Sequence, residues 1–142
     1  MRVRQADQTF SVTPDRVSVS TTIGKLAGPT RGKYEAAGRF VTIRFKFKNL
    51  GPKPMSASDA ARYSLAIETG RGKRYSVGHL SADCRWLSVS AAKRAQRRLP
   101  TLPTRVGDTV ATAVVYVVPT VDTPMQWRAS LDERAAKLPD PK

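Results

Sequence analysis

The sequence has very few of the residues that build most catalytic and metal sites. It contains one cysteine, Cys84, and one histidine, His79, among 142 residues. A single cysteine cannot form a disulfide bond within the chain, and Cys84 with Asp83 and His79 is too small a set for a tetrahedral zinc site. The 11 acidic residues are scattered, so no pair of carboxylates indicates acid–base hydrolysis. These absences predict a protein without catalytic residues, metal or cofactor.

Two short motifs bear on catalysis, and both have a simpler interpretation. His79 has Ser76 and Ser81 nearby in the chain, but no Ser/His/Asp spacing surrounds it, and we interpret it as a surface histidine rather than a general base. The segment Thr69-Gly70-Arg71-Gly72-Lys73 has some likeness to a phosphate-binding loop. It lacks the spacing and the following helix of such loops, so we interpret it as the tip of a hairpin.

The sequence also lacks a long apolar run. No stretch is long enough to cross a bilayer, and the basic segment 1–5 has no apolar region behind it, which argues against a signal peptide within this sequence. The chain is thus expected to be either intracellular or the mature segment of an exported protein. Its length fits one domain, which we assign to residues 1–131. The Pro- and charge-rich tail, residues 132–142, is expected to fray.

Residues 40–48 give the clearest structural signal. Four apolar side chains alternate there with four polar ones, namely Val41, Ile43, Phe45 and Phe47 with Thr42, Arg44, Lys46 and Lys48. A period of two places one set on each face of a β-strand, so the pattern predicts a half-buried strand. The segment Asn49-Leu50-Gly51-Pro52 is expected to end it.

Six further runs predict strands, at residues 8–13, 16–23, 63–68, 73–80, 108–118 and 125–131. We expect Pro14-Asp15 to turn the chain between the first two. Residues 108–118 are apolar on both faces, which favours a central strand covered on both sides. Residues 90–99 break the period, and Ser90 and Pro100 would begin and end a short helix there.

About seven strands without β-α-β spacing predict an all-β fold, an antiparallel β-sandwich with one short helical insert. Three segments, 47–54, 68–75 and 105–119, follow a familiar order: a strand ending in Asn-x-Gly, a Gly-rich hairpin, and a strand led by Arg105-Val106-Gly107 that ends in Pro119. This order resembles the immunoglobulin-like domains of secreted proteins and lipoproteins of Gram-positive bacteria, a family that includes a small secreted mycobacterial antigen.

The resemblance covers residues 10–131 and rests on structural motifs. It implies an immunoglobulin-like sandwich in an extracellular or cell-envelope protein, and it implies no activity and no site residue. The chain departs from the family in its strongly basic charge and in the predicted helix at 90–99.

The charge of the chain is strongly one-sided. Lysine and arginine number 25 against 11 acidic residues, and residues 1–100 hold 20 basic and 6 acidic residues, whereas residues 101–142 hold 5 of each. An excess of this size predicts attraction to an anionic partner such as nucleic acid, an anionic membrane surface or an acidic cell-wall polymer. The alternative interpretation is a solvated surface that serves only solubility.

The candidate anion-binding residues lie in two clusters. The first comprises Arg85 and four residues that would share one side of the predicted helix, Lys93, Arg94, Arg97 and Arg98. The second surrounds the predicted hairpin turn and comprises Arg71, Lys73 and Arg74. A further row, Arg44, Lys46 and Lys48, would line the polar face of the strand at 40–48.

These patterns favour a non-enzymatic binding domain, and the resemblance implies an extracytoplasmic location, so that the partner would be an anionic envelope polymer or a protein. The alternative is a basic protein that binds the nucleic-acid phosphate backbone without sequence specificity. No zinc knuckle, recognition helix or aromatic RNA-binding signature indicates base-specific contacts. The sequence leaves the ligand and the oligomeric state open.

Overall fold

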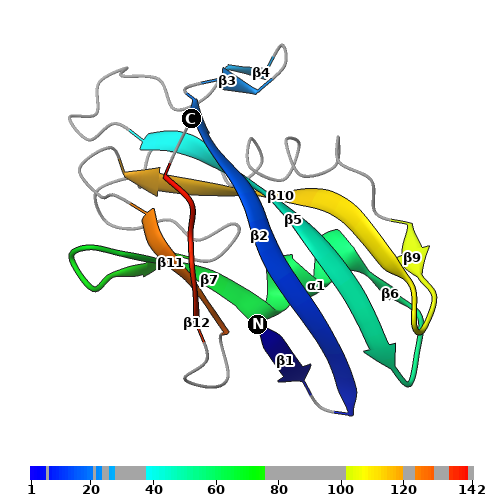
Figure 1. Ribbon diagram of the computed structural model, residues 1–142. Coiled ribbons are helices and arrows are strands. Elements are labelled where there is room, and N and C mark those ends of the chain that lie inside the picture. Colours follow the sequence, from blue (N-terminus) through cyan, green and yellow to red (C-terminus); the bar gives the residue numbers. More distant parts are fainter. Residues whose placement is uncertain are drawn as a thin grey trace.

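The computed structural model describes residues 1–5, 7–20, 22–23, 26–27, 38–75, 102–119, 124–129 and 135–140 (Figure 1). This part of the chain is all-β apart from one short helix, and every strand pair is antiparallel. The predicted all-β class is therefore confirmed. The described strands number twelve rather than about seven, because several consist of two or three residues, too few to show a period in the sequence.

The first sheet has the order β1-β2-β5-β10. Its strands are β1 (Arg2–Gln5), β2 (Gln8–Ser20), β5 (Gly38–Gly51) and β10 (Thr109–Pro119). The strand β5 lies between β2 and β10 and pairs with both along most of its length. The strongest alternation in the sequence thus occupies an inner position of the sheet.

The second sheet has the order β12-β11-β7-β8. Its strands are β7 (Leu65–Thr69), β8 (Arg74–Tyr75), β11 (Pro124–Ala129) and β12 (Ala135–Lys137). Two small pairs complete the strands: β3 (Thr22–Ile23) with β4 (Leu26–Ala27), and β6 (Met55–Ser56) with β9 (Pro103–Thr104). The helix α1 (Ala57–Ser64) leads from β6 into β7.

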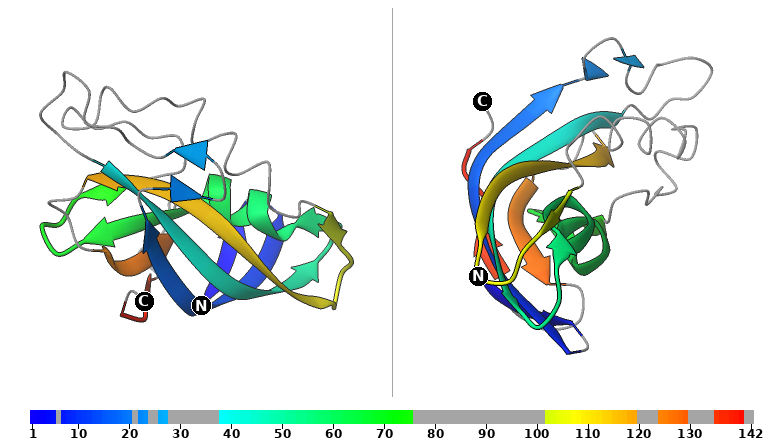
Figure 2. Two further views of the ribbon diagram at one scale, coloured as in Figure 1. Left: turned by 90° about the horizontal axis from the view of Figure 1, so that it is seen from above. Right: turned by 90° about the vertical axis from the view of Figure 1, so that its right-hand side faces the viewer.

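The two sheets and α1 enclose one hydrophobic core. Figure 2 shows the first sheet as a curved layer, with α1 and β11 on its concave side. Core side chains come from both layers, and the Phe45 ring meets the Trp127 ring edge-on with 5.0 Å between centroids. This arrangement of two antiparallel layers around a shared core is consistent with the predicted sandwich.

The predicted register of β5 is confirmed. Its four alternating apolar residues are buried, with at most 1% of their surface exposed: Val41, Ile43, Phe45 and Phe47. The intervening cations Arg44, Lys46 and Lys48 are exposed. The predicted turn after residue 69 is confirmed too, because the Thr69 amide donates to the Lys73 carbonyl and the Gly72 amide to the Thr69 carbonyl, each at 2.9 Å. Gly72 has a φ of 76°, which glycine adopts without steric cost.

The predicted turn at Pro14-Asp15 is wrong. Residues 8–20 form the single strand β2, and the pairing with β5 shifts by one residue between Pro14 and Arg16. Asp15 is therefore the extra residue of a β-bulge. A bulge accommodates proline within a continuous ladder. Pro14-Asp15 therefore marks an irregularity of the backbone, as predicted, but the irregularity is a bulge and not a turn.

The helix α1 was not predicted, and the next strand begins at Leu65 instead of the predicted Tyr63. The helix buries one face at spacing i, i+3, i+4 and i+7, formed by the small residues Ala57, Ala60, Ala61 and Ser64. Small side chains give a weak hydrophobic signal, whereas the alternation of Tyr63, Leu65 and Ile67 was strong. The helix predicted at 90–99 lies outside the described residues.

Two further expectations need correction. Part of the tail expected to fray is packed: β12 pairs with β11, and Leu138 is buried in the core. Within the described residues β10 pairs only with β5 and lies last in the order of the first sheet, not at the central position predicted for it. It is nevertheless covered on both sides near its middle, as predicted, because Val114 and Val115 point to opposite faces and are both buried.

Candidate anion-binding surface

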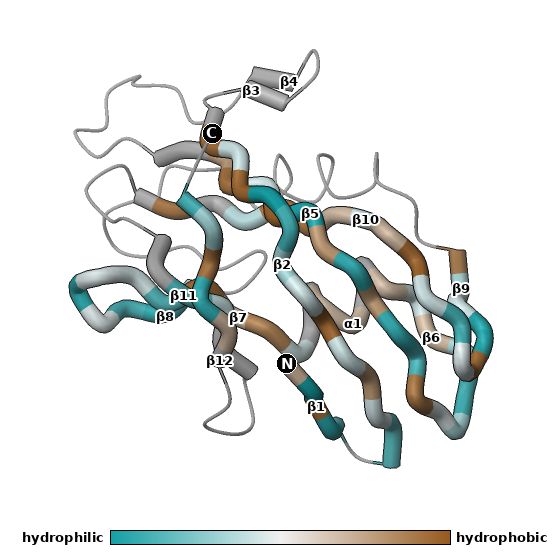
Figure 3. The backbone as a smooth tube through the Cα atoms, viewed as in Figure 1, coloured by the Kyte–Doolittle hydropathy of each residue, from teal (hydrophilic) through white to brown (hydrophobic). Residues whose placement is uncertain are grey.

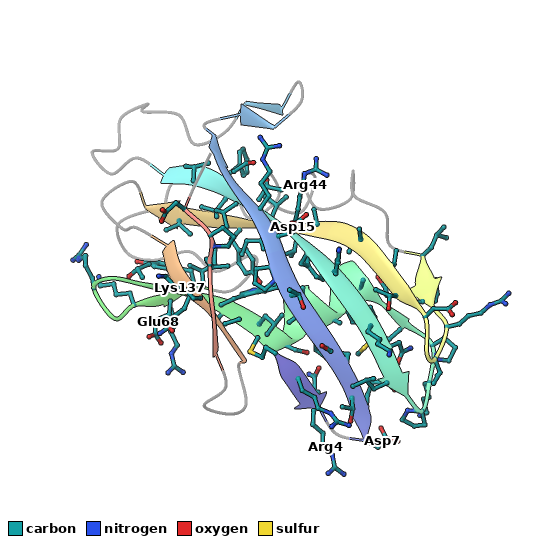
Figure 4. All side chains as sticks on the ribbon, viewed as in Figure 1. Arg4, Asp7, Asp15, Arg44, Glu68 and Lys137 are labelled. Carbon is teal, nitrogen blue, oxygen red and sulfur yellow. The ribbon has the colours of Figure 1, made fainter. Side chains whose placement is uncertain are left out.

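The outer face of the first sheet gathers cations from three strands. We call this surface the basic face and define it by six exposed residues: Arg2 and Arg4 from β1, Arg16 from β2, and Arg44, Lys46 and Lys48 from β5. They share one face because each alternates with a buried neighbour on its own strand, as Arg44 does with Ile43 and Phe45. Figure 4 labels Arg44 and Arg4 on this side of the molecule.

Strand pairing sets the spacing of these charges. Arg16 lies directly opposite Arg44 in the ladder of β2 and β5. Successive outward residues on β5 lie about 6.8 Å apart, given a rise of about 3.4 Å per residue. The cations therefore form a row along β5, with a like-charge pair at one end. Like charges directly opposite each other destabilise a sheet, and an anion bound between them would relieve that repulsion.

Little negative charge offsets the basic face. The described residues of β1, β2, β5 and β10 include one acid, Asp15, which is exposed at the bulge. Within the described part of the chain, no ion pair involves Arg16, Arg44, Lys46 or Lys48. Their charges are thus directed to solvent, where a polyanion can reach them.

Hydroxyl groups lie between the cations. Lys46 is flanked across the ladder by Thr13, and Lys48 lies between Ser11 on β2 and Thr109 on β10. Hydroxyls can donate hydrogen bonds to phosphate or carboxylate oxygens. The face therefore combines charge with neutral donors, and none of its exposed described residues is aromatic.

The hairpin cations lie on the second sheet, away from the basic face. Arg74 is not a free cation, because its Nε lies 3.0 Å from Glu68 Oε2. Gln126 Nε2 donates to the other Glu68 oxygen at 2.7 Å, and Lys137 lies opposite Gln126 in the ladder. This polar row crosses all four strands of the second sheet and gives Arg74 an ion-pair partner on β7. Arg71 and Lys73 are exposed at the turn.

The other predicted cluster cannot be placed. Arg85, Lys93, Arg94, Arg97 and Arg98 lie outside the described residues, as do His79 and Cys84. The sequence pattern predicts Arg44, Lys46 and Lys48 as a polar row but does not join Arg2, Arg4 and Arg16 to it. The alternation of Arg16 with Val17 was a usable signal. The position of Arg16 opposite Arg44 depends on strand pairing, which the local sequence pattern does not predict.

A buried polar network fixes the end of β5. Asn49 is fully buried, and its Nδ2 donates to the carbonyls of Lys53 at 2.7 Å and Thr104 at 2.9 Å. Its Oδ1 accepts hydrogen bonds from Gln8 Nε2 and from the Gly51 amide, both at 2.8 Å. All hydrogen-bonding positions of the Asn49 side chain are used, which indicates a structural role and leaves none for a ligand.

A second buried polar group joins the layers. Trp127 Nε1 donates to the Tyr116 hydroxyl at 2.7 Å, and that hydroxyl donates to the Leu65 carbonyl at 3.2 Å. Burial raises the pKa of Tyr116 well above its usual range, although the hydrogen bond from Trp127 acts in the opposite direction. A neutral, fully buried phenol held in this way is a packing element and is not positioned for proton transfer with a substrate.

No group of three or more His, Cys, Asp or Glu residues within the described ranges is arranged to hold a metal ion. No helix in those ranges is long and apolar enough to span a membrane. Comparison of the chain with family models, with curated proteins and with solved structures yields no match in any of the three.

Proposed function

We propose that this protein is a non-enzymatic binding domain that holds a linear anionic polymer on its basic face. The observation that carries the proposal is the row of exposed cations on β5, extended by Arg16 opposite Arg44 and lacking ion pairs within the described residues. Unpaired cations on one face attract polyanions through phosphate or carboxylate contacts, independently of sequence.

The shape of the sheet favours a flexible polymer over a rigid duplex. The first sheet is curved with its core on the concave side (Figure 2), so its outer face is convex. A stiff, convex duplex, whose persistence length is about 50 nm, can touch a convex face only over a short stretch. A flexible chain can follow the row of cations. The absence of exposed aromatic side chains among the described residues of this face also gives single-stranded bases nothing to stack on.

The resemblance to immunoglobulin-like domains of secreted Gram-positive proteins supports an extracytoplasmic setting. Anionic envelope polymers, such as those with glycerol phosphate repeats, are flexible and carry the required charge. We therefore place the protein in this setting and take an envelope polymer as its partner. The alternative function, phosphate-backbone binding of nucleic acid, becomes one arm of the test.

The test is equilibrium binding to poly(glycerol phosphate), inorganic polyphosphate and a DNA duplex across a salt series. We expect salt-dependent binding to both flexible polymers and weaker binding to the duplex. The triple variant Arg44→Glu, Lys46→Glu and Lys48→Glu should lose most of this affinity. Each lost contact should lower the slope of log affinity against log salt by about 0.7, the value for flexible single strands.

The control reverses three exposed cations outside the basic face: Arg71→Glu and Lys73→Glu in the turn after β7, and Lys137→Glu on β12. It also tests the hairpin cluster predicted from the sequence. Both triple variants change the net charge equally. Equal losses of affinity would mean that diffuse net charge drives binding, which contradicts a localised site. Preference for the duplex would favour the nucleic-acid alternative. A quadruple reversal of Lys93, Arg94, Arg97 and Arg98 tests separately the contribution predicted for the segment that contains them.

A further inference from the structure

The large hydrophobic side chains that are exposed in the described part of the chain all lie at one end of the molecule. They are Leu50 and Val110, each 37% exposed, Val106, 47% exposed, and Leu102, 84% exposed. They come from the end of β5, the residue before β9, the turn before β10, and the start of β10. We call these four residues the apolar tip. In Figure 3 the tube near β9 and the neighbouring turns alternates between hydrophobic residues, in brown, and hydrophilic residues, in teal.

Backbone contacts hold the two turns of the tip together. The Gly107 amide donates to the Asn49 carbonyl at 2.7 Å, and the Asn49 amide donates to the Asp108 carbonyl at 3.1 Å. A Cβ placed on Gly51 would lie 3.1 Å from a Val106 methyl group, so the turn rests directly on the end of β5. These contacts hold the turn that carries Val106 against the end of β5 that carries Leu50, which lowers the ordering cost of binding.

Cations surround the apolar tip. Lys48 lies two residues before Leu50 on the same side of β5, so the basic face runs into the tip. Lys53 and Arg105 are also exposed in its two turns, and Asp108 is the exposed acid among the described residues there. The tip therefore combines apolar contact area with a net positive charge.

We propose that the apolar tip inserts shallowly into the headgroup region of an anionic lipid bilayer. Exposed apolar side chains ringed by lysine and arginine are the usual composition of surfaces that bind anionic membranes. A hydrophilic polymer offers nothing to cover Leu102 and Val106. A protein partner would need about 800 Å² of contact per side, and four partly exposed side chains are too small a core for such an interface. This inference goes beyond polymer binding and depends on different residues.

Vesicle sedimentation tests it, with phosphatidylcholine vesicles compared with vesicles that also contain phosphatidylglycerol. We expect the protein to sediment with the anionic vesicles and to retain part of this binding at high salt, because the apolar contribution is not screened. The double variant Leu102→Asn and Val106→Thr keeps the net charge and should weaken vesicle binding about tenfold, as expected for about 1.4 kcal/mol of lost apolar burial. Its binding to soluble polyphosphate should be unchanged.

A variant with added apolar surface tests the same proposal in the opposite direction. Thr109 is exposed opposite Lys48, on the side of the sheet that carries Leu50, so Thr109→Val should tighten binding to anionic vesicles. Polyphosphate binding should not rise, because the variant removes a hydroxyl from the basic face. The proposal is overturned if the double variant sediments like the unmodified protein, or if high salt removes all vesicle binding. It is equally overturned if the unmodified protein fails to sediment at low salt. None of these outcomes depends on the polymer measurements, so failure here is distinguishable from failure of the proposed function.

Discussion

Trp127 Nε1 donates a 2.7 Å hydrogen bond to the Tyr116 hydroxyl, and this bond connects the two sheets through the core. The Tyr116 hydroxyl in turn donates to the Leu65 carbonyl. One phenol thus satisfies a donor and an acceptor that lie on β11 and β7. Since both residues are fully buried, water is not available to replace the phenol.

Tyr116→Phe should therefore destabilise the fold more than the loss of one exposed hydrogen bond would. The substitution keeps the ring but leaves the Trp127 donor and the Leu65 carbonyl without this partner. We expect a loss of about 1–3 kcal/mol in the free energy of unfolding, measured by urea denaturation. A loss below about 0.5 kcal/mol would show that the hydroxyl contributes nothing net to the layer contact.

The same residue predicts a dependence of stability on alkaline pH. Burial raises the pKa of Tyr116 in the folded protein above its ordinary value of 10.0. The unfolded chain therefore releases this proton first as pH rises, and the contribution to stability is present below pH 10 and lost progressively above it. Tyr116→Phe should flatten the decline of unfolding free energy above pH 10. Identical slopes for the two proteins would contradict this assignment.

Phe45→Ala tests the inward register of β5. The Phe45 side chain is 1% exposed, and its ring packs against Trp127. We expect a loss of about 3–5 kcal/mol, because the truncation removes buried area and leaves a cavity. Lys46→Ala, at the next position on the exposed face, should change stability by less than about 0.5 kcal/mol. Equal effects would mean that the register is shifted by one residue.

Asn49→Ala should destabilise the end of β5 and the turns packed against it. The substitution removes four hydrogen bonds and leaves the Gly51 amide and the Thr104 carbonyl without the Asn49 side chain, whereas Gln8 Nε2 and the Lys53 carbonyl keep their mutual hydrogen bond at 2.9 Å. The loss of these buried hydrogen bonds should together cost about 3 kcal/mol. Hydrogen exchange should locate the loss of protection at Gly51 and Gly107. Loss of protection spread evenly over both sheets would contradict a local role.

Thr112→Val should stabilise the protein. The Thr112 hydroxyl is buried without a hydrogen-bond partner among the described residues, and valine has nearly the same shape. Removing the unsatisfied hydroxyl should raise the free energy of unfolding by about 1 kcal/mol, measured by thermal or urea denaturation. Thr109→Val, on the exposed side of the same strand, is the matched control and should have little effect. A destabilised Thr112→Val variant would indicate that the hydroxyl has a partner.

Features that depend on near neighbours in the chain follow from the local sequence. The alternation at 40–48 assigned each side chain of β5 to its face, because the two faces of a strand repeat with a period of two whatever lies beside it. The Gly-rich segment at 69–73 determined the hairpin turn, since Gly72 can adopt a positive φ. The run at 125–131 follows the same rule, and Trp127 within it is buried.

Which rows of side chains become neighbours depends on how the strands pair in the folded chain. Arg16 lies opposite Arg44, and Asn49 reaches Gln8 and Thr104, because strand pairing joins residues far apart in sequence. The charge-rich tail carried no local sign of order, yet pairing with β11 buries Leu138. Local periodicity selects the face on which a side chain lies. The partner strand and its register follow from packing the whole chain around one core, and that packing created both the basic face and the apolar tip.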